Sequence, residues 1–355
     1  MRILLVLKRF DFGGAENHVC DLANNLAELG HDVFVLAGKG RQVIRLNPKV
    51  ILIPYRLNDF LFLVNILIIF FLIKKHKIDV IHAHQRIAIF YCSILKKISK
   101  KPLVVTVHGR TRLDLRTNFT RNTPDQIIFV SSHVFNVSAC YEQIKDKSVV
   151  IPNGVVVTTS KLSALPYSIS YVSRIDRKHS VVILMMIQEV LPKLIIDFPT
   201  LTFNIIGEGK DFRRVEHEVE KFNFRCNRTV CNIKGFQPDV NTIFHKSSLV
   251  LGVGRVALEA LACGVPVLSV NHNRLGSVIT TLNYTSYKAK NFIAVRDEPP
   301  TTPRLASLIV DFFRNYQALI EETKIIQRHI KAEFNFEVLT KEVVDTYINA
   351  IQLNR

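Results

Sequence analysis

Residues 251–267 read LGVGRVALEALACGVPV, and this stretch decides the fold. An apolar segment runs into a turn with Gly252 and Gly254, a helical segment follows and ends at Gly264, and Pro266 opens a second apolar segment. Strand, helix and strand in this order form the repeating unit of a parallel sheet. Free amides at the start of such a helix can hold the oxygens of a phosphate. The stretch therefore predicts an α/β fold with an anion site at the helix start.

The same alternation of apolar and helix-length segments extends over the whole chain, which indicates doubly wound parallel sheets. With 355 residues the chain has the length of two domains. The segment 155–167 is polar and is the predicted linker, so we expect Rossmann-like domains over 1–165 and 166–333 and a C-terminal helix within 334–355. The predicted strands of the first sheet are residues 3–7, 32–37, 50–53, 80–82, 103–107, 126–130 and 148–151, and those of the second are 169–172, 201–206, 229–233, 249–253, 266–270 and 291–295.

The composition excludes several other classes of protein. Hydrophobic residues make up 48% and charged residues 22%, which argues against long disorder, a fibre or a disulfide scaffold. The six cysteines are scattered without zinc-site spacing, and we interpret them as reduced thiols and expect no metal. Only five apolar residues precede Lys8, too few for a signal peptide, so we expect a cytoplasmic protein.

The basic charge of the chain is concentrated in its first half. The net charge is 47 − 30 = +17, of which residues 1–165 contribute 23 − 11 = +12. Because no nucleic-acid motif accompanies this charge, an anionic membrane surface is the favoured partner. Residues 60–73 are a run of 14 mostly apolar residues that leads into Lys74 and Lys75, and the lysines of 96–101 add a second basic cluster. The run is either a core helix or a helix lying on the membrane, since it is too short to span one.

In the first half, candidate site residues follow the predicted strands. Gly13 and Gly14 precede a helix and allow its first amides to approach an anion, with Glu16 nearby. His108 follows the strand 103–107 and can donate to a sugar hydroxyl or a phosphate. Arg110 and Arg112 follow it, and together with Glu16 they are the candidates on the acceptor side, whereas we interpret His82 and His84 as structural.

In the second half, Arg174 and Lys178 follow the strand 169–172. A guanidinium and an ammonium there can neutralise a diphosphate leaving group without a metal. Glu259 lies four residues after Arg255 on one helix face, so its carboxylate either accepts from a ribose diol or pairs with Arg255. The spacing of Gly252, Gly254 and Ala257 also fits a dinucleotide-binding turn, but the acidic residue expected after the next strand is missing, and a nicotinamide oxidoreductase is the weaker alternative.

Together these segments resemble glycosyltransferase family 4, the retaining enzymes with the GT-B fold that use nucleotide sugars. The resemblance covers nearly the whole chain. It rests on Gly13-Gly14-Ala15-Glu16 with Gly30-His31-Asp32-Val33, on residues 79–84, on Thr106-Val107-His108-Gly109, on residues 150–155, on Arg174 to Lys178, on residues 206–209, and on residues 258–267.

The resemblance implies roles for these residues and an architecture in which two sheets face each other across a cleft. Arg174 and Lys178 would bind the donor diphosphate, Glu259 its ribose, and His108 would line the pocket of the donor sugar. Gly13 and Gly14 would lie close to the phosphate and the acceptor, with Gly254 and Arg255 on the donor side. The family uses no metal or cofactor, and commonly the leaving phosphate helps to deprotonate the acceptor. Residues 334–353 would form a helix that crosses back to the first domain.

The sequence departs from the family pattern at two positions. The family's pair of glutamates keeps only Glu259, because Leu251 stands eight residues earlier, and the usual Lys-Gly reads Lys178-His179.

From the resemblance as a whole, we expect a retaining glycosyltransferase that acts on a surface glycan, lipopolysaccharide or lipid-linked acceptor at the membrane. A non-catalytic subunit that binds a sugar nucleotide, or a nucleotide-sugar epimerase, is the alternative.

Overall fold

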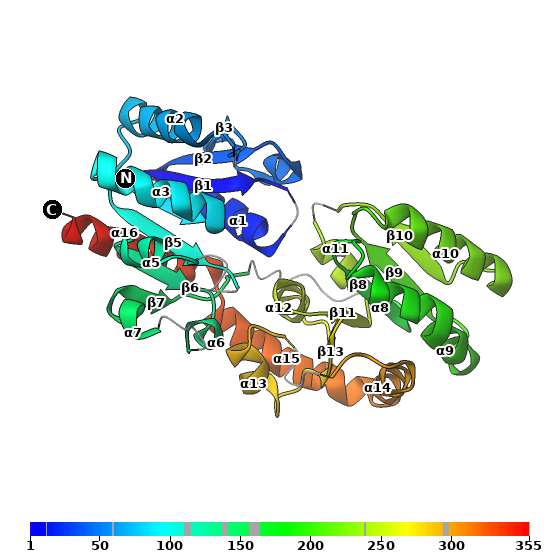
Figure 1. The fold of residues 1–355 in the computed structure, drawn as a ribbon. Helices are drawn as coiled ribbons and strands as arrows, with labels where there is room; N and C mark the ends of the chain where they lie inside the picture. Colours follow the sequence, from blue (N-terminus) through cyan, green and yellow to red (C-terminus); the bar gives the residue numbers. More distant parts are fainter. Residues whose placement is uncertain are drawn as a thin grey trace. The chain divides into compact units, whose positions relative to one another are not determined.

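The computed structural model describes residues 1–11, 13–58, 60–109, 115–136, 141–155, 164–237, 239–293 and 298–354. The chain forms two compact units (Figure 1). Unit 1 contains Met1–Gly154 and Phe336–Arg355, and unit 2 contains Val155–Asn335. Each unit is an α/β structure around its own sheet, as the alternating sequence pattern predicts.

The sheet of unit 1 has seven parallel strands in the order β3-β2-β1-β4-β5-β6-β7. All seven strands predicted in this half are confirmed, each within a few residues. They are β1 Arg2–Arg9, β2 Asp32–Gly38, β3 Ile51–Pro54, β4 Val80–His84, β5 Leu103–Val107, β6 Gln126–Phe129 and β7 Ser148–Val150. The helices are α1 Gly14–Glu28, η1 Arg41–Arg45, α2 Phe62–Lys75, α3 Arg86–Ser99, α5 Asn118–Asn122, α6 Ser132–Asn136, α7 Tyr141–Ile144, η2 Lys145–Lys147 and α16 Phe336–Leu353.

Both faces of this sheet are buried, which explains why its strands are continuously apolar. Ile3 and Leu5 of β1 point to the face covered by α1 and α16, while Leu4 and Val6 point to the face covered by α2 and α3. Figure 1 shows α16, the last helix of the chain, packed on the unit that begins at the N-terminus. Tyr347 of α16 is fully buried there.

The sheet of unit 2 has six strands in the order β10-β9-β8-β11-β12-β13, all parallel to their neighbours except β13. Its strands are β8 Ser168–Val172, β9 Thr202–Ile206, β10 Cys231–Lys234, β11 Leu249–Gly252, β12 Val267–Asn271 and β13 Arg274–Val278. Its helices are α8 Ser180–Met185, η3 Met186–Val190, α9 Leu191–Asp197, α10 Phe212–Cys226, α11 Asn241–Phe244, α12 Arg255–Ala262, α13 Tyr284–Ala289, α14 Thr302–Arg314 and α15 Tyr316–Glu333. The stretch 251–267 forms β11, α12 and the beginning of β12, as predicted.

One predicted strand of unit 2 is wrong. Residues 291–293 form a turn in which Asn291 and Phe292 have positive φ angles of 53° and 56°, while residues 294 and 295 lie outside the described part of the chain. The side chain of Phe292 is buried against Phe334 within this turn and does not belong to a sheet. The sixth strand is instead β13, which returns antiparallel beside β12.

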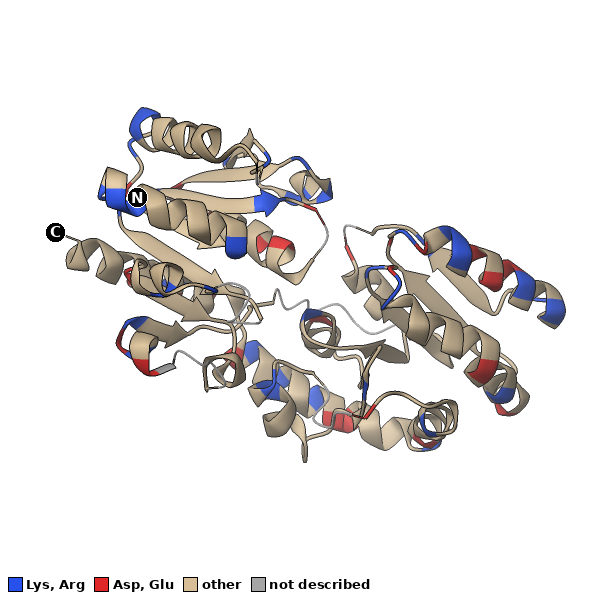
Figure 2. Ribbon diagram, in the orientation of Figure 1, with Lys and Arg blue, Asp and Glu red and all other residues tan. Residues whose placement is uncertain are grey.

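Helix α2 divides its apolar residues between the core and the surface. Ile69, Leu72 and Ile73 are buried against the sheet. Leu63 and Leu67 are 70% and 65% exposed, and the helix ends in Lys74 and Lys75, at one edge of unit 1 (Figure 2). The run 60–73 is therefore a core helix on one face and an exposed apolar surface on the other. None of the helices within the described ranges is both long enough and apolar enough to cross a membrane.

None of the cysteines within the described residues is in a disulfide. They are Cys20, Cys92, Cys226, Cys231 and Cys263, and Cys140 lies outside the described residues.

Candidate functional site

The glycine pair after β1 starts helix α1 in unit 1. Gly13 caps the helix with φ 155°, a conformation that favours glycine, and its carbonyl accepts from the amide of Asn17 at 3.0 Å. Apart from its chain neighbours and the backbone of its own helix, no described residue places an atom within 4 Å of the position that a Cβ on Gly14 would take. The backbone at the helix start is therefore open to a ligand, as an anion site requires.

Glu16 has a structural partner at this edge of the sheet. Its carboxylate accepts from the amide of Gln85 at 2.7 Å, and the other end of that amide faces the backbone N–H of Lys8 at 3.4 Å. Gln85 has a positive φ of 70° and precedes α3. Glu16 thus holds the loop after β4 against the end of β1, in addition to its predicted role on the acceptor side.

His108 belongs to a cluster of imidazoles that the sequence analysis did not recognise. His84, the last residue of β4, lies with its Nδ1 3.0 Å from Nε2 of His108. The ring of His18, from α1, lies 5.1 Å from that of His108. The ring of His82 lies 4.1 Å from that of His84, tilted by 40°, and its Nδ1 lies 2.7 Å from the hydroxyl of Tyr347. The signal that would have revealed the pair in β4 is the two-residue spacing, which places both histidines on one face of the strand.

The cluster fixes which nitrogen of His108 carries a proton. Burial and the neighbouring imidazoles hold the pKa of His84 well below its usual value, so His84 is neutral. Its Nε2 is buried and has no hydrogen-bond partner among the described residues, which makes Nδ1 the favoured place for its proton. Nε2 of His108 then accepts from His84, and His108 presents an Nδ1–H donor. A donor of this kind suits a sugar hydroxyl or a phosphate oxygen.

The buried histidines make the stability of the protein depend on pH. Burial and His108 lower the pKa of His82 to about 3, and the pKa of His84 is also lowered. Below the unfolded pKa of about 6.5, the unfolded state therefore binds protons that the folded state excludes. We expect the free energy of unfolding to have its full value above pH 6.5. On acidification it should fall by up to about 1.4 kcal/mol per pH unit for each excluded proton.

Urea titrations between pH 7.5 and 5 measure this slope. His84→Asn should flatten it by up to the share of one proton, whereas replacing the exposed His133 with glutamine should leave it unchanged. Equal slopes for the wild type and His84→Asn would contradict the exclusion of a proton by the buried His84.

Arg110 and Arg112, the other candidate site residues of this half, lie outside the described residues.

In unit 2, the loop after β8 holds two exposed cations around a buried anchor. Arg174 and Lys178 are exposed, while Ile175 between them is fully buried. The amide of Ile175 donates to the carbonyl of Glu208 at 2.9 Å. The loop is therefore fixed at the carboxyl edge of the sheet, with its positive charges directed away from the core.

The glycines Gly207 and Gly209 make this anchoring possible. A Cβ on Gly207, whose φ is +146°, would lie 1.8 Å from the carbonyl oxygen of Ser173, and a Cβ on Gly209 would lie 2.1 Å from that of Ile175. The two loops pack backbone against backbone, which only glycine permits. A motif that reads as a simple turn in the sequence thus positions Arg174.

The departure at His179 is accommodated without strain. His179 has φ −75° and ψ −28°, a right-handed conformation that any residue adopts. Its Nδ1 lies 2.7 Å from Oδ1 of Asp176, and the amides of Lys178 and His179 donate to the same oxygen. Partial burial raises the pKa of Asp176, but the hydrogen bonds from His179 and Lys178 outweigh it and lower that pKa. The carboxylate therefore stays charged and holds the turn that carries Lys178.

Helix α12 begins at a glycine with a positive φ. Gly254 has φ 61°, and its own amide donates to the carbonyl of Phe292 at 3.2 Å. The amide of Leu258 donates to the carbonyl of Gly254 at 3.0 Å, so residues 255–257 have the amides that a helix leaves without a carbonyl of its own. If an anion binds at this helix start, as the sequence predicts, these three amides, and not that of Gly254, are the candidate backbone donors.

Glu259 and Arg255 form an ion pair. The Nε of Arg255 lies 2.6 Å from Oε1 of Glu259, and their side chains are only 8% and 17% exposed. This is the alternative offered by their spacing in the sequence. A contact of Glu259 with a ribose stays a prediction, and it would use the second carboxylate oxygen.

Leu251 stands where the family pattern has its first glutamate. It is fully buried within β11 and belongs to the core between the sheet and α8, α9 and α10. Its side chain lies in that core and carries no charge. A contact that other members of the family make with the carboxylate at this position would therefore have to be made by a different group in this protein.

Comparison with protein families matches both units. The family described as Glycosyltransferase Family 4 matches residues 12–158, and Glycosyl transferases group 1 matches residues 162–291. Together the two matches include the residues of both halves that are candidates for the site.

Individual relatives agree with the family matches. An uncharacterized glycosyltransferase of Methanocaldococcus jannaschii is 26% identical over 59% of this chain, and the match spans 60% of that protein's length. The phosphatidyl-myo-inositol mannosyltransferase of Propionibacterium freudenreichii is 25% identical over 76% of each chain.

A solved structure shows the fold. Anabaena HepE, in complex with UDP-glucose, superposes with a TM-score of 0.74 at 19% identity, covering 98% of this chain and 99% of its own. The two sheets of the chain thus form the two Rossmann-like domains of the GT-B fold. On the two family matches and this fold, the chain belongs to glycosyltransferase family 4.

Proposed function

We propose that the protein transfers a sugar from a nucleoside diphosphate sugar to a glycan or lipid-linked acceptor at the inner face of the cytoplasmic membrane. The observation that carries this proposal is the loop after β8, where Arg174 and Lys178 flank the buried anchor Ile175. Two exposed cations on a rigid loop suit the two phosphates of such a donor. The complex of HepE with UDP-glucose supports this class of donor.

The remaining candidates take complementary roles in this proposal. The amides of 255–257 contribute to the phosphate site, Arg255 fixes the carboxylate of Glu259, and the second oxygen of Glu259 accepts from the ribose. His108 donates from Nδ1 to the transferred sugar. Glu16, Arg110 and Arg112 are proposed on the acceptor side.

We also propose that transfer retains the anomeric configuration and that the cations replace a metal at the diphosphate. In this mechanism the acceptor hydroxyl attacks the anomeric carbon on the face from which the diphosphate departs, and a leaving phosphate oxygen takes the hydroxyl proton. Arg174 and Lys178 stabilise the negative charge that develops on the leaving group. Proton NMR of the product distinguishes the two anomers, and an inverted product would overturn the mechanism.

Nucleotide binding tests the donor site. One of UDP, GDP, ADP or CMP, at 100 times its dissociation constant, should stabilise unit 2 by about 2.7 kcal/mol, or about 5–10 °C in Tm. Glu259→Gln should reduce this shift, because the amide still accepts from Arg255 but binds the ribose less strongly.

The control for this experiment is Glu220→Gln, which removes an exposed carboxylate from α10. Each shift is measured against the same variant without nucleotide, so that a change in stability alone does not count. A full shift in Glu259→Gln would exclude the ribose contact. A shift only with NAD or NADP would favour the oxidoreductase alternative, and conversion of a donor without an acceptor would favour an epimerase.

A non-catalytic role is the second candidate, and the burial of Leu251 favours it. Without a carboxylate at that position, the protein would bind a sugar nucleotide without transferring its sugar to an acceptor. Such a subunit would show the thermal shift but neither transfer nor slow hydrolysis of any donor. Hydrolysis of one donor at a measurable rate would exclude it.

The exposed face of α2 supports the membrane part of the proposal. Leu63→Glu combined with Leu67→Glu should release the protein from vesicles that contain anionic lipids, because both side chains are exposed and apolar on a helix that ends in lysines. Vesicle flotation measures this. The matched control is Ile196→Glu combined with Leu282→Glu, which introduces the same charge at exposed apolar positions of unit 2. Equal binding by the two double variants would contradict a role for α2.

A further inference from the structure

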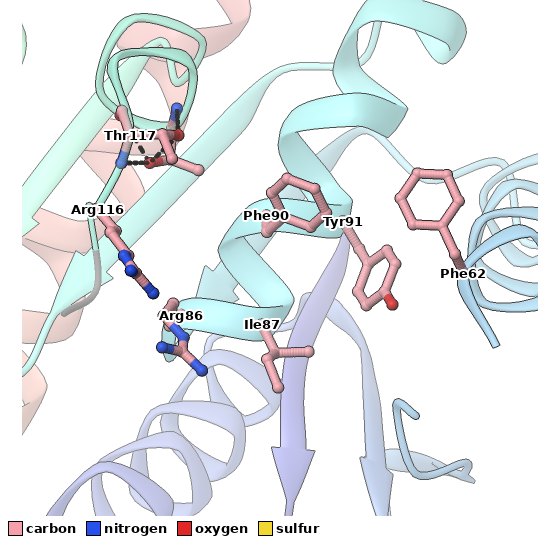
Figure 3. Close-up of a pocket in the computed structure, with 8 residues that line it drawn as sticks. Phe62, Arg86, Ile87, Phe90, Tyr91, Arg116 and Thr117 are labelled. Carbon is pink, nitrogen blue, oxygen red and sulfur yellow. Dashed lines mark hydrogen bonds between the residues drawn. The ribbon is translucent and has the colours of Figure 1, made fainter. Parts of the chain in front are cut away.

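Unit 1 contains a pocket whose lining includes none of the candidate site residues. It lies among the starts of α2 and α3 and the segment before α5, and its volume is about 350 Å³ (Figure 3). A volume of this size falls within the range of small-molecule sites. The pocket is lined by Phe62, Arg86, Ile87, Phe90, Tyr91, Arg116, Thr117 and Thr120.

One wall of the pocket is aromatic. The ring of Phe62 lies 5.8 Å from Tyr91 and 6.2 Å from Phe90, and Phe90 lies 5.7 Å from Tyr91. Tyr91 is buried and its hydroxyl donates to the carbonyl of Asn58 at 3.2 Å, so this ring is held in place. Phe62 and Phe90 are 40% and 37% exposed and present apolar surface to a ligand.

The opposite wall carries two guanidinium groups. Arg86 and Arg116 both line the pocket, and Figure 3 shows the Arg116 side chain extending toward Arg86. Across the described ranges of the chain, neither guanidinium has an acidic partner within ion-pair distance. Two such groups with no counter-charge near an apolar wall are electrostatically complementary to an anion.

The segment that carries Arg116 is held by its neighbours. Arg121 donates from Nε to the carbonyl of Leu115 at 3.0 Å and from Nη2 to that of Arg116 at 3.3 Å. Thr117 and Thr120 cap each other, each hydroxyl accepting from the backbone amide of the other at 3.1 Å. Arg116 therefore starts from a fixed backbone, which reduces the entropy lost when its side chain binds.

We propose that this pocket binds a lipid with a phosphate headgroup, with the phosphate between Arg86 and Arg116 and the beginning of the hydrocarbon chain against Phe62 and Phe90. The bidentate geometry of arginine suits phosphate oxygens. The aromatic wall has no role toward a free phosphate. Phe62 also begins α2, whose exposed face continues with Leu63 and Leu67. An apolar tail leaving the pocket thus has a continuous apolar surface to follow toward a bilayer.

The pocket also adjoins the candidate acceptor side of unit 1. Arg86 directly follows Gln85, whose side chain contacts Glu16. A lipid phosphate between the arginines would therefore lie close to the loop on which the acceptor is expected. This inference rests on the proposed function, and it makes the phosphate-bearing lipid the acceptor class.

Calorimetric titration of the full chain tests the pocket with three probes. These are dioctanoyl phosphatidic acid below its micelle concentration, dioctanoylglycerol, and inorganic phosphate. We expect the phosphatidic acid to bind at least tenfold more tightly than either of the others, because only it engages both walls. Arg86→Gln combined with Arg116→Gln should weaken this binding at least tenfold, since both charge-assisted contacts are lost.

The matched control is Lys39→Gln combined with Lys341→Gln. It removes the same charge from exposed positions of unit 1 that have no assigned role, and its affinity should stay within twofold of the wild type. Unchanged affinity in the arginine double variant would overturn the proposal. Equally tight binding of inorganic phosphate would reduce the pocket to a site for free anions.

The nucleotide thermal shift separates this inference from the proposed function. If the arginine double variant keeps a full nucleotide shift but binds phosphatidic acid like the wild type, the pocket proposal fails alone. If the wild type binds phosphatidic acid through the arginines but shows no shift with any nucleotide, the donor assignment fails and the lipid site stands.

Discussion

Arg174→Ala is expected to lower kcat/KM for sugar transfer by about 100- to 1000-fold, equivalent to about 2.7–4 kcal/mol of transition-state stabilisation. The guanidinium is exposed on a loop that Ile175 and the backbone of Glu208 hold rigid. In the proposed mechanism it would therefore meet the developing charge of the diphosphate from a backbone that is already in place. Steady-state rates with the donor identified by nucleotide binding measure the loss.

Arg177→Ala is the control for this experiment, because it also removes an exposed positive charge from the same loop. It should change the rate by less than about threefold, as a screened surface charge does. Arg174→Lys should fall between the two, since lysine keeps the charge but not the fork of donors. Similar losses in Arg174→Ala and Arg177→Ala would show that only the net charge of the loop matters.

Gly207→Ala is expected to destabilise unit 2 by about 3–5 kcal/mol. The positive φ of this residue costs an L-amino acid about 1–2 kcal/mol, and the overlap of the new Cβ with the carbonyl of Ser173 forces a backbone shift that costs about as much again or more. Because Ser173 precedes Arg174, nucleotide binding should weaken together with stability. Urea unfolding of the full chain, monitored by circular dichroism, measures the first effect.

Gly235→Ala provides the comparison. The three atoms nearest to its Cβ would all belong to the Glu208 side chain, the closest being Oε1 at 3.0 Å. This carboxylate accepts from the amide of Phe236 and needs to shift only slightly. We expect a cost below about 1 kcal/mol, in the range of ordinary surface changes. Equal destabilisation by the two variants would mean that the contact between the loops does not determine stability here.

The sequence predicts most strands of both sheets because each is a short apolar run between turn residues. It fails at β13, where Arg274, Gly276 and Ser277 interrupt the apolar pattern. It also places a strand at 291–295, because Phe292 is apolar for a different reason. The local pattern of apolar residues indicates which residues are buried, but it does not distinguish a buried residue in a turn from one in a strand.

The candidate site shows the same limit. The spacing of Arg255 and Glu259 within one helix predicts their ion pair as one of two possibilities, the other being a ribose contact of Glu259. The sequence does not predict the contact of His108 with His84 and His18, because these residues come from a loop, a strand and a helix that only the fold brings together. The need for Gly207 was hidden likewise, since the carbonyl that excludes a side chain belongs to Ser173, far away in the sequence.

The return of α16 to unit 1 sets an order of assembly during synthesis. Unit 2 is continuous from Val155 to Asn335, so it can fold as soon as it leaves the ribosome. Unit 1 is made first but waits for residues 336–354, because Val343 and Tyr347 complete the core on one face of its sheet and His82 receives its tyrosine partner only then. Until residues 336–354 have been made, that apolar face is open to solvent and to other nascent chains.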